Sequence, residues 1–210
     1  MKLHHITAAA LLALSAGVAT AAPIVLSNGG TNYLGVTDNG SSHTDQGITG
    51  RGVTGEISLK ETLVMNLNGT YTIKSFQLGL LYDGPEFHDV NEVAKVSFFG
   101  ASGLIGSFTL TATDAMSASW TGAGSAINLS PAAQPGSGHW LVDGLHIADV
   151  TKIKFSALEG MCGTAGGKCT NQSDFIVTNV TAVPEPGTYA MFAAGLGALA
   201  FVARRRQRRD

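Results

Sequence analysis

Apolar and polar side chains alternate along the middle of the chain, a pattern typical of half-buried β-strands. One alternating run covers residues 57–73 and is interrupted by Asn68-Gly69, and a second run covers residues 76–82. An Asn-Gly pair between alternating runs predicts a β-hairpin turn. The apolar positions change from odd to even numbers after Ile73. This change of phase predicts a β-bulge near Lys74-Ser75.

Further strand-like segments follow, separated by turn residues. Residues 93–114 predict two strands joined by a Gly-Ala-Ser-Gly turn, and three more strands are expected at residues 139–144, 150–158 and 174–183. No amphipathic helix stands out between these segments. Residues 22–182, called the body below, are therefore expected to form an all-β fold, namely a single β-sandwich domain of which a jelly roll is one form.

The first 21 residues have the three parts of a secretory signal peptide. Lys2 supplies a positive start, residues 6–18 are apolar, and Ala19-Thr20-Ala21 has the small-x-small spacing of a cleavage site. We expect signal peptidase to cut after Ala21, because a cut one residue later would leave Pro23 at the first mature position.

Residues 183–210, called the tail below, combine a stiff start, an apolar stretch and a basic end. Pro184-Glu185-Pro186 restricts the backbone, and residues 189–203 carry no charge. As a helix this stretch would be about 22 Å long against a hydrocarbon core of ~30 Å, so a short membrane helix needs flanking residues or a thinned bilayer. Positive charges on the cytoplasmic side would place the body outside. The basic end consists of Arg204, Arg205, Arg206, Arg208 and Arg209.

A signal peptide together with such a tail resembles the PEP-CTERM sorting signal of exported proteins of Gram-negative bacteria. Pro184-Glu185-Pro186 supplies the motif, residues 189–203 the membrane segment and residues 204–209 the basic end. The resemblance implies processing by an exosortase, a membrane-embedded cysteine protease-transpeptidase. It also implies export, temporary tethering in the inner membrane, cleavage near the motif, and release or attachment at the cell surface or extracellular matrix, often with exopolysaccharide. An ordinary C-terminal anchor is the alternative, but it leaves the Pro-Glu-Pro placement unexplained.

The body is acidic although the whole chain is close to neutral. Residues 22–182 hold 13 of the 15 acidic residues but only 7 of the 13 lysine and arginine residues, so the net charge of the body is −6. Nucleic acids and anionic lipids are bound through basic patches. The charge balance therefore argues against both as partners of the body.

The chain has two cysteines, Cys162 and Cys169. In an oxidising compartment outside the inner membrane, a single pair of this kind is expected to form a disulfide. Closing so short a loop would stabilise the body by roughly 2.5 kcal/mol in the chain-entropy model. A metal site built on these cysteines would need further ligands that the neighbouring sequence does not offer.

The motifs of common catalytic sites are missing from the sequence. The chain has no Gly-x-Ser-x-Gly, no His-Glu-x-x-His and no phosphate-binding Gly-x-x-x-x-Gly-Lys-[Ser/Thr], although it contains 27 glycines. Paired carboxylates of the kind that hydrolyse glycosides remain open at this point. We therefore expect a protein that is not an enzyme, with a secreted polysaccharide hydrolase as the third hypothesis.

Acidic and amide side chains gather in one segment between two predicted strands. Oxygen-rich loops of extracellular β-domains bind Ca²⁺, which takes 6–8 oxygen ligands. The same side chains could instead satisfy backbone groups of a loop, and their spacing does not match an EF-hand. The polar residues 37–47 are interpreted as a loop. The candidate Ca²⁺ ligands are Asp83, Glu86, Asp89, Asn91 and Glu92.

Taken together, these patterns lead to one main hypothesis and one alternative from a different class. The main hypothesis is an exported envelope or extracellular-matrix protein, sorted through the tail, with a structural or adhesive role. The alternative is an extracellular module that binds Ca²⁺ or carbohydrate. The main hypothesis needs no cofactor, and Ca²⁺ would be bound only under the alternative. Exopolysaccharide is the candidate partner outside the cell.

Overall fold

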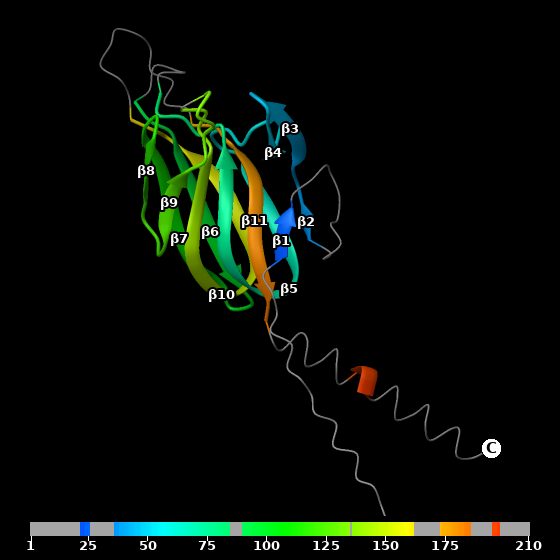
Figure 1. Ribbon diagram of the computed structural model, residues 1–210. Coiled ribbons are helices and arrows are strands. Elements are labelled where there is room, and N and C mark those ends of the chain that lie inside the picture. Colours follow the sequence, from blue (N-terminus) through cyan, green and yellow to red (C-terminus); the bar gives the residue numbers. More distant parts are fainter. Residues whose placement is uncertain are drawn as a thin grey trace, which may run out of the picture.

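β-Strands account for nearly all the regular structure in the residues that the computed structural model describes, which are 22–25, 36–84, 90–134, 136–161, 173–185 and 195–197 (Figure 1). Neighbouring strands run antiparallel throughout. The predicted all-β class is therefore confirmed. The strands are β1 (Ala22–Val25), β2 (Thr37–Asp38), β3 (Ser41–Asp45), β4 (Ile48–Gly52), β5 (Thr62–Gly79), β6 (Val93–Gly100), β7 (Gly103–Asp114), β8 (Ser117–Trp120), β9 (Ser125–Asn128), β10 (Trp140–Leu158) and β11 (Ile176–Pro184).

The strands are hydrogen bonded into one sheet whose main path runs β3-β4-β11-β5-β10-β6-β7-β8. The long strands β5 and β10 each contribute to two halves of this sheet. In the first half, residues 71–79 of β5 and 140–150 of β10 pair with each other and with β11 and β9. In the second half, residues 62–66 and 152–156 pair with each other and with β2 and β6. The sheet continues from β6 through β7 to β8.

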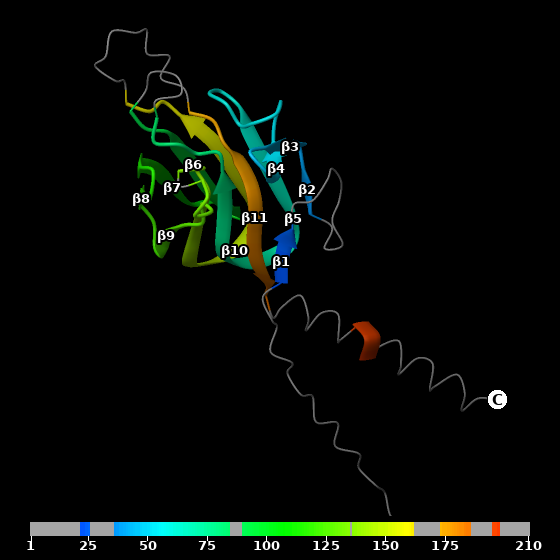
Figure 2. The same cartoon turned by 45° about the horizontal axis from the view of Figure 1, so that its top comes forward.

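The two halves of the sheet face each other across one apolar core (Figures 1 and 2). Phe76 in the first half contacts Trp120 of β8 and Phe155 of β10, with ring centroids 5.4 and 5.9 Å apart. Trp140 is also buried, and its indole N–H donates a hydrogen bond to the backbone oxygen of Leu81 at 2.8 Å. Burial of these large aromatic surfaces is the main favourable term in such a fold.

The expected hairpin at Asn68-Gly69 is wrong, because β5 continues through this pair as one bent strand. Between Val150↔Tyr71 and Lys152↔Asn66, β5 advances by five residues while β10 advances by two. Gly69 has a φ of 122°, which suits glycine alone and allows the strand to turn a sharp corner. The pair therefore marks the corner between the two halves of the sheet and not a turn between two strands.

The predicted bulge near Lys74-Ser75 is confirmed. Ser75 pairs with Thr181 of β11, whereas Ile73 pairs with Ala182, so Lys74 is an extra residue in β5. One extra residue reverses the alternation of side chains along a strand. Ile73 and Phe76 are consequently both buried, although their sequence separation is odd.

The interpretation of residues 37–47 as a loop is wrong. This polar segment forms β2 and β3, and β3 pairs with β4 as a hairpin whose turn contains Gln46 and Gly47 at φ of 47° and 77°. β3 is largely exposed, so it shows no apolar alternation from which a strand could be recognised. The other predicted strands are found, and the segments 139–144 and 150–158 belong to one strand, β10.

Several chain segments meet at one end of the domain, called the exit end below. β1 is antiparallel to β11 with Ala22 opposite Ala182, so β1 begins where β11 ends. The corner of β5 lies there too, since the backbone N–H of Glu185 donates to the oxygen of Thr70 at 3.0 Å. Figure 1 shows β11 running down to this end. The opposite end holds the turn between β7 and β8.

The short membrane helix predicted at residues 189–203 lies outside the described residues except for 195–197, which are helical. In the part of the chain that the structure describes, no helix reaches the length and apolar character needed to span a bilayer. The membrane helix therefore stays a prediction.

Candidate functional site

The sorting motif predicted in the tail begins inside the folded sheet. Pro184 is the last residue of β11, where it pairs with Tyr71 of β5, and Glu185 follows directly. A proline fits the end of a strand because it has no backbone N–H to donate to a neighbouring strand. Pro186 and the arginine cluster, Arg204, Arg205, Arg206, Arg208 and Arg209, lie outside the described residues.

The side chain of Glu185 is held by the body. Its Oε1 accepts two hydrogen bonds, one from the hydroxyl of Thr72 at 3.1 Å and one from the backbone N–H of Asp149 at 2.8 Å. With the backbone bond from Glu185 to Thr70, three hydrogen bonds join the motif glutamate to the corners of β5 and β10. The middle residue of the motif is thus part of the folded surface.

Local backbone geometry explains why Glu185 finds these donors. Asp149 lies at the corner of β10 with a φ of 60°, which interrupts the regular ladder and leaves its N–H for a side chain. Thr72 pairs with Val183, two residues before Glu185. A carboxylate accepting two donors is the geometry expected of charge-assisted hydrogen bonds.

A hollow of roughly 360 Å³ lies beside this contact. Thr70, Asp149, Thr151 and residues 100–105, which span the turn between β6 and β7, line it. Leu104 and Ile105 in this turn region have exposed fractions of 61% and 45%. The surroundings of Glu185 therefore combine polar backbone groups with exposed aliphatic side chains.

The predicted Ca²⁺ ligands are only partly described, since Glu86 and Asp89 lie outside the described residues. Oδ1 of Asn91 accepts a hydrogen bond from the backbone N–H of Met161 at 2.8 Å, and Oε2 of the buried Glu92 accepts one from Tyr82 at 2.6 Å. Both side chains therefore support loop backbone. Across the residues that the structure covers, no three His, Cys, Asp or Glu side chains are close enough to hold a metal ion. The Ca²⁺ site, including Asp83, stays a prediction.

Cys162 and Cys169 lie outside the described residues, and the described part of the chain contains no disulfide. The expected pairing between them stays a prediction. The segment that carries them begins after Met161, whose N–H is already bonded to Asn91.

The described histidines of the body are spread over separate parts of the fold, and His88 lies outside the described residues. Nε2 of His43 lies 3.5 Å from Oε1 of Glu56, and both side chains are partly exposed. His139 is half-buried, and burial of its imidazole lowers the pKa of His139 below the ordinary value of 6.5. His146 lies exposed at the corner of β10. The expectation that the protein is not an enzyme stays a prediction.

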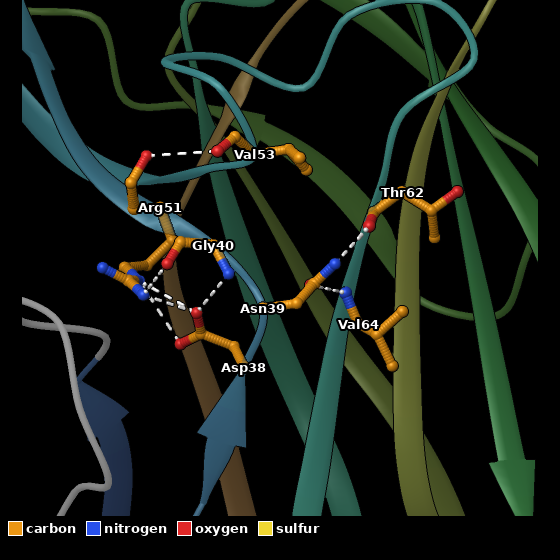
Figure 3. Close-up of polar contacts among 8 residues, drawn as sticks. Asp38, Asn39, Gly40, Arg51, Val53, Thr62 and Val64 are labelled. Atoms are coloured by element: carbon orange, nitrogen blue, oxygen red, sulfur yellow. Dashed lines mark hydrogen bonds and ion pairs between the residues drawn. The ribbon is translucent and has the colours of Figure 1, made fainter.

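A buried ion pair was missed by the sequence analysis (Figure 3). Arg51 of β4 donates from Nε to both carboxylate oxygens of Asp38 at 3.2 and 3.3 Å, and from Nη2 to Asp38 and to the oxygen of Gly40, both at 2.5 Å. The two side chains are only 4% and 7% exposed. The pair ties β2 to β4, and nothing in the spacing of two charges 13 positions apart could have indicated it.

Asn39 extends this polar cluster to the edge of β5. Its amide nitrogen donates to the oxygen of Thr62 at 3.1 Å, and its Oδ1 accepts from the N–H of Val64 at 2.7 Å (Figure 3). One side chain thus pairs with a backbone N–H and a backbone oxygen of β5 that a neighbouring strand would otherwise pair with. The cluster stabilises the edge of the sheet at β2, and the contacts named here do not point to a catalytic role.

Comparison with known families adds one finding. The family model described as the PEP-CTERM protein-sorting motif matches residues 182–207. No curated protein and no solved structure matches the chain. The match begins inside β11 and includes Glu185, whose side chain is hydrogen bonded to the body. The first residues of the sorting motif are therefore part of the folded domain.

Proposed function

On the basis of the PEP-CTERM protein-sorting motif that this chain carries, we propose that it is an exported bacterial protein processed by an exosortase and sorted to the cell surface. The observation that carries this proposal is the family match at residues 182–207. The signal peptide expected at residues 1–21 supports export. The arginines after residue 203 support a tethered precursor whose body faces away from the cytoplasm.

Outside the inner membrane, the body is proposed to act as a structural or adhesive component of the envelope or extracellular matrix. Two facing halves of one sheet, joined through a continuous apolar core, support a stable β-sandwich suited to that role.

The test is made in the native host by separating cytoplasm, inner membrane, outer envelope and medium. The unaltered protein is expected beyond the inner membrane and shortened at both ends. Pro186→Ala alters the motif directly after Glu185, so the hydrogen bonds of Glu185 to the body are kept. This variant is expected to accumulate uncut in the inner membrane. Deletion of the host's exosortase is expected to give the same accumulation.

Pro131→Ala is the matched control, because Pro131 lies in a loop of the body far along the chain from the motif. It is expected to be processed as the unaltered protein is. The proposal is wrong if the unaltered protein and Pro186→Ala have the same length and the same distribution among the fractions.

A further inference from the structure

Both segments that are expected to enter the membrane leave the body from the same end. The predicted signal peptide ends at Ala21, and β1 begins at Ala22 opposite Ala182 of β11. The tail leaves at Glu185, next to Thr70 at the corner of β5. A precursor attached to the inner membrane through either segment therefore has its exit end toward the bilayer.

The exit end also carries an exposed apolar pair. Leu104 and Ile105 follow the turn between β6 and β7, and in the described part of the chain they are the only two large exposed apolar residues adjacent in sequence. The turn is close to Glu185, because Asp149, which donates to Glu185, shares a hollow with residues 100–105. Exposed apolar patches on soluble domains commonly mark contact surfaces.

Two lysines of β10 lie over Phe99, the ladder neighbour of Leu104. The ammonium groups of Lys152 and Lys154 lie 5.5 and 5.2 Å from the ring centre of Phe99, which pairs with Leu104 across the β6–β7 ladder. Asp149 and Glu185 contribute negative charge at the same end, so these two acidic residues offset the two lysines. Leu104 and Ile105 offer aliphatic side chains to the apolar part of a bilayer, and the lysines are long enough to reach its headgroups. This combination fits a bilayer surface better than a purely ionic partner.

We infer that in the tethered precursor the exit end rests on the outer face of the inner membrane, with Leu104 and Ile105 in the interfacial region of the bilayer. This inference rests on the proposed function, since it requires the tail to be in the membrane. Only residues 186–188 separate Glu185 from the apolar stretch, and such a link spans at most about 14 Å. The occupant of the surface is the lipid bilayer.

Because the tether is short, even a weak contact is enough to keep the exit end on the bilayer. Linking two binding elements through a short segment turns the second contact into an intramolecular one with a high effective concentration. The docked body then holds Glu185 at the bilayer surface, where a membrane-embedded processing enzyme can reach the motif. Cleavage removes the tether, so the same contact becomes too weak to retain the body and the product leaves the membrane.

The test places a photo-crosslinking amino acid at Leu104 in residues 22–210, the chain expected after signal peptidase has cut, reconstituted into vesicles of phosphatidylethanolamine and phosphatidylglycerol. Position 116 is the matched control, because Met116 has a similar exposed fraction, 58% against 61%. Met116 lies beyond the other end of β7, a 12-residue strand whose ends would be about 36 Å apart at roughly 3.3 Å per residue. Irradiation followed by mass spectrometry measures lipid adducts at each position.

The inference predicts several-fold more lipid adduct at position 104 than at position 116, with the excess lost after the tail is removed by protease. Equal adducts at the two positions in protein that floats with the vesicles would overturn the docking surface while leaving the tether intact. Protein that does not float with the vesicles would overturn the tethered precursor of the proposed function as well. Near-ultraviolet circular dichroism of each substituted protein checks that it is folded.

Discussion

At the scale of single residues, Glu185 serves both the fold and the sorting motif. Its carboxylate accepts from Thr72 and from Asp149, which lie 113 and 36 positions earlier in the chain. A motif read by a processing enzyme is usually pictured as an extended, free segment. Here its middle residue is anchored, so the motif begins on the surface of the body.

Replacing Thr72 by Val tests the energetic role of this anchor. The change removes one donor to the Glu185 carboxylate and keeps the branched shape that suits a strand. The free energy of unfolding is expected to fall by about 0.5–1.5 kcal/mol, the usual net value of one hydrogen bond. Urea denaturation measures it. Thr44→Val, which removes a hydroxyl from an exposed pair with Thr49 in the β3–β4 hairpin, is expected to change stability less; equal losses would contradict the anchor.

The ion pair between Asp38 and Arg51 is expected to be sensitive to loss of one partner. Asp38→Ala leaves a buried guanidinium without its carboxylate, and breaking a buried pair in this way costs roughly 3–5 kcal/mol. Glu56→Ala is the control, because its pairing with His43 is partly exposed and such pairs contribute about 0–1 kcal/mol. Thermal unfolding of both variants measures the difference. A similar loss in the two variants would show that the Asp38–Arg51 pair is not effectively buried.

Burial of His139 predicts a dependence of stability on pH. Its pKa is lowered in the folded state, so the unfolded chain binds a proton more readily. The stability penalty is absent above the ordinary pKa of 6.5 and grows as the pH falls below that value, until the folded pKa is reached.

His139→Leu is therefore expected to flatten the dependence of unfolding free energy on pH between neutral and mildly acidic conditions. Denaturant unfolding over this range measures the slope. His146→Asn keeps His139 and should retain the slope, and asparagine tolerates the positive φ of that position. An unchanged slope in His139→Leu would mean that other groups cause the pH dependence.

At the scale of the elements, the alternation of apolar and polar residues along β5 predicted the local structure better than the Asn68-Gly69 dipeptide did. The change after Ile73 located the bulge at Lys74 correctly, because burial on one face fixes the register of a strand. Asn68-Gly69 was misread, because a glycine at positive φ suits a corner within a strand as well as a hairpin turn. Local sequence cannot separate the two, since the outcome depends on β10, which begins more than 70 positions later.

Deletion of Lys74 tests the bulge. Without the extra residue, the segment from Ser75 to Gly79 would keep its ladder with β11 only by turning Phe76 and Leu78 away from the core. Losing the burial of two such side chains costs roughly 3–6 kcal/mol at 1.5–3 kcal/mol each, enough to unfold many domains. Loss of the near-ultraviolet circular dichroism signal and of a cooperative thermal transition is expected.

Deletion of Ala133, in a loop of the body, is the control for this prediction. It shortens the chain by one residue outside the strands and is expected to keep a cooperative transition. If the Lys74 deletion unfolds at the same temperature as the unaltered protein, the register of β5 does not depend on the bulge.

At the scale of the whole molecule, the sequence indicated the sorting motif of the tail but not the contacts that the fold makes around it. The tail motif is a contiguous pattern, and the family match bears out its sorting part. The docking of Glu185 and the grouping of Leu104 with Lys152 arise from strands brought together by the fold. The net charge of the body also hides local differences, because β6, β8 and residues 103–112 of β7 contain no acidic residue although the body carries −6. The expectation from net charge that anionic lipids are not partners of the body stays a prediction.

The central claim is that the chain is exported and processed through its tail, and the intact mass of the protein purified from its native host tests it most directly. The account predicts a product that starts at Ala22, ends between residues 184 and 187, and is recovered beyond the inner membrane. A product that retains residues 189–209 and stays in the inner membrane would contradict it, because the tail would then be a lasting anchor.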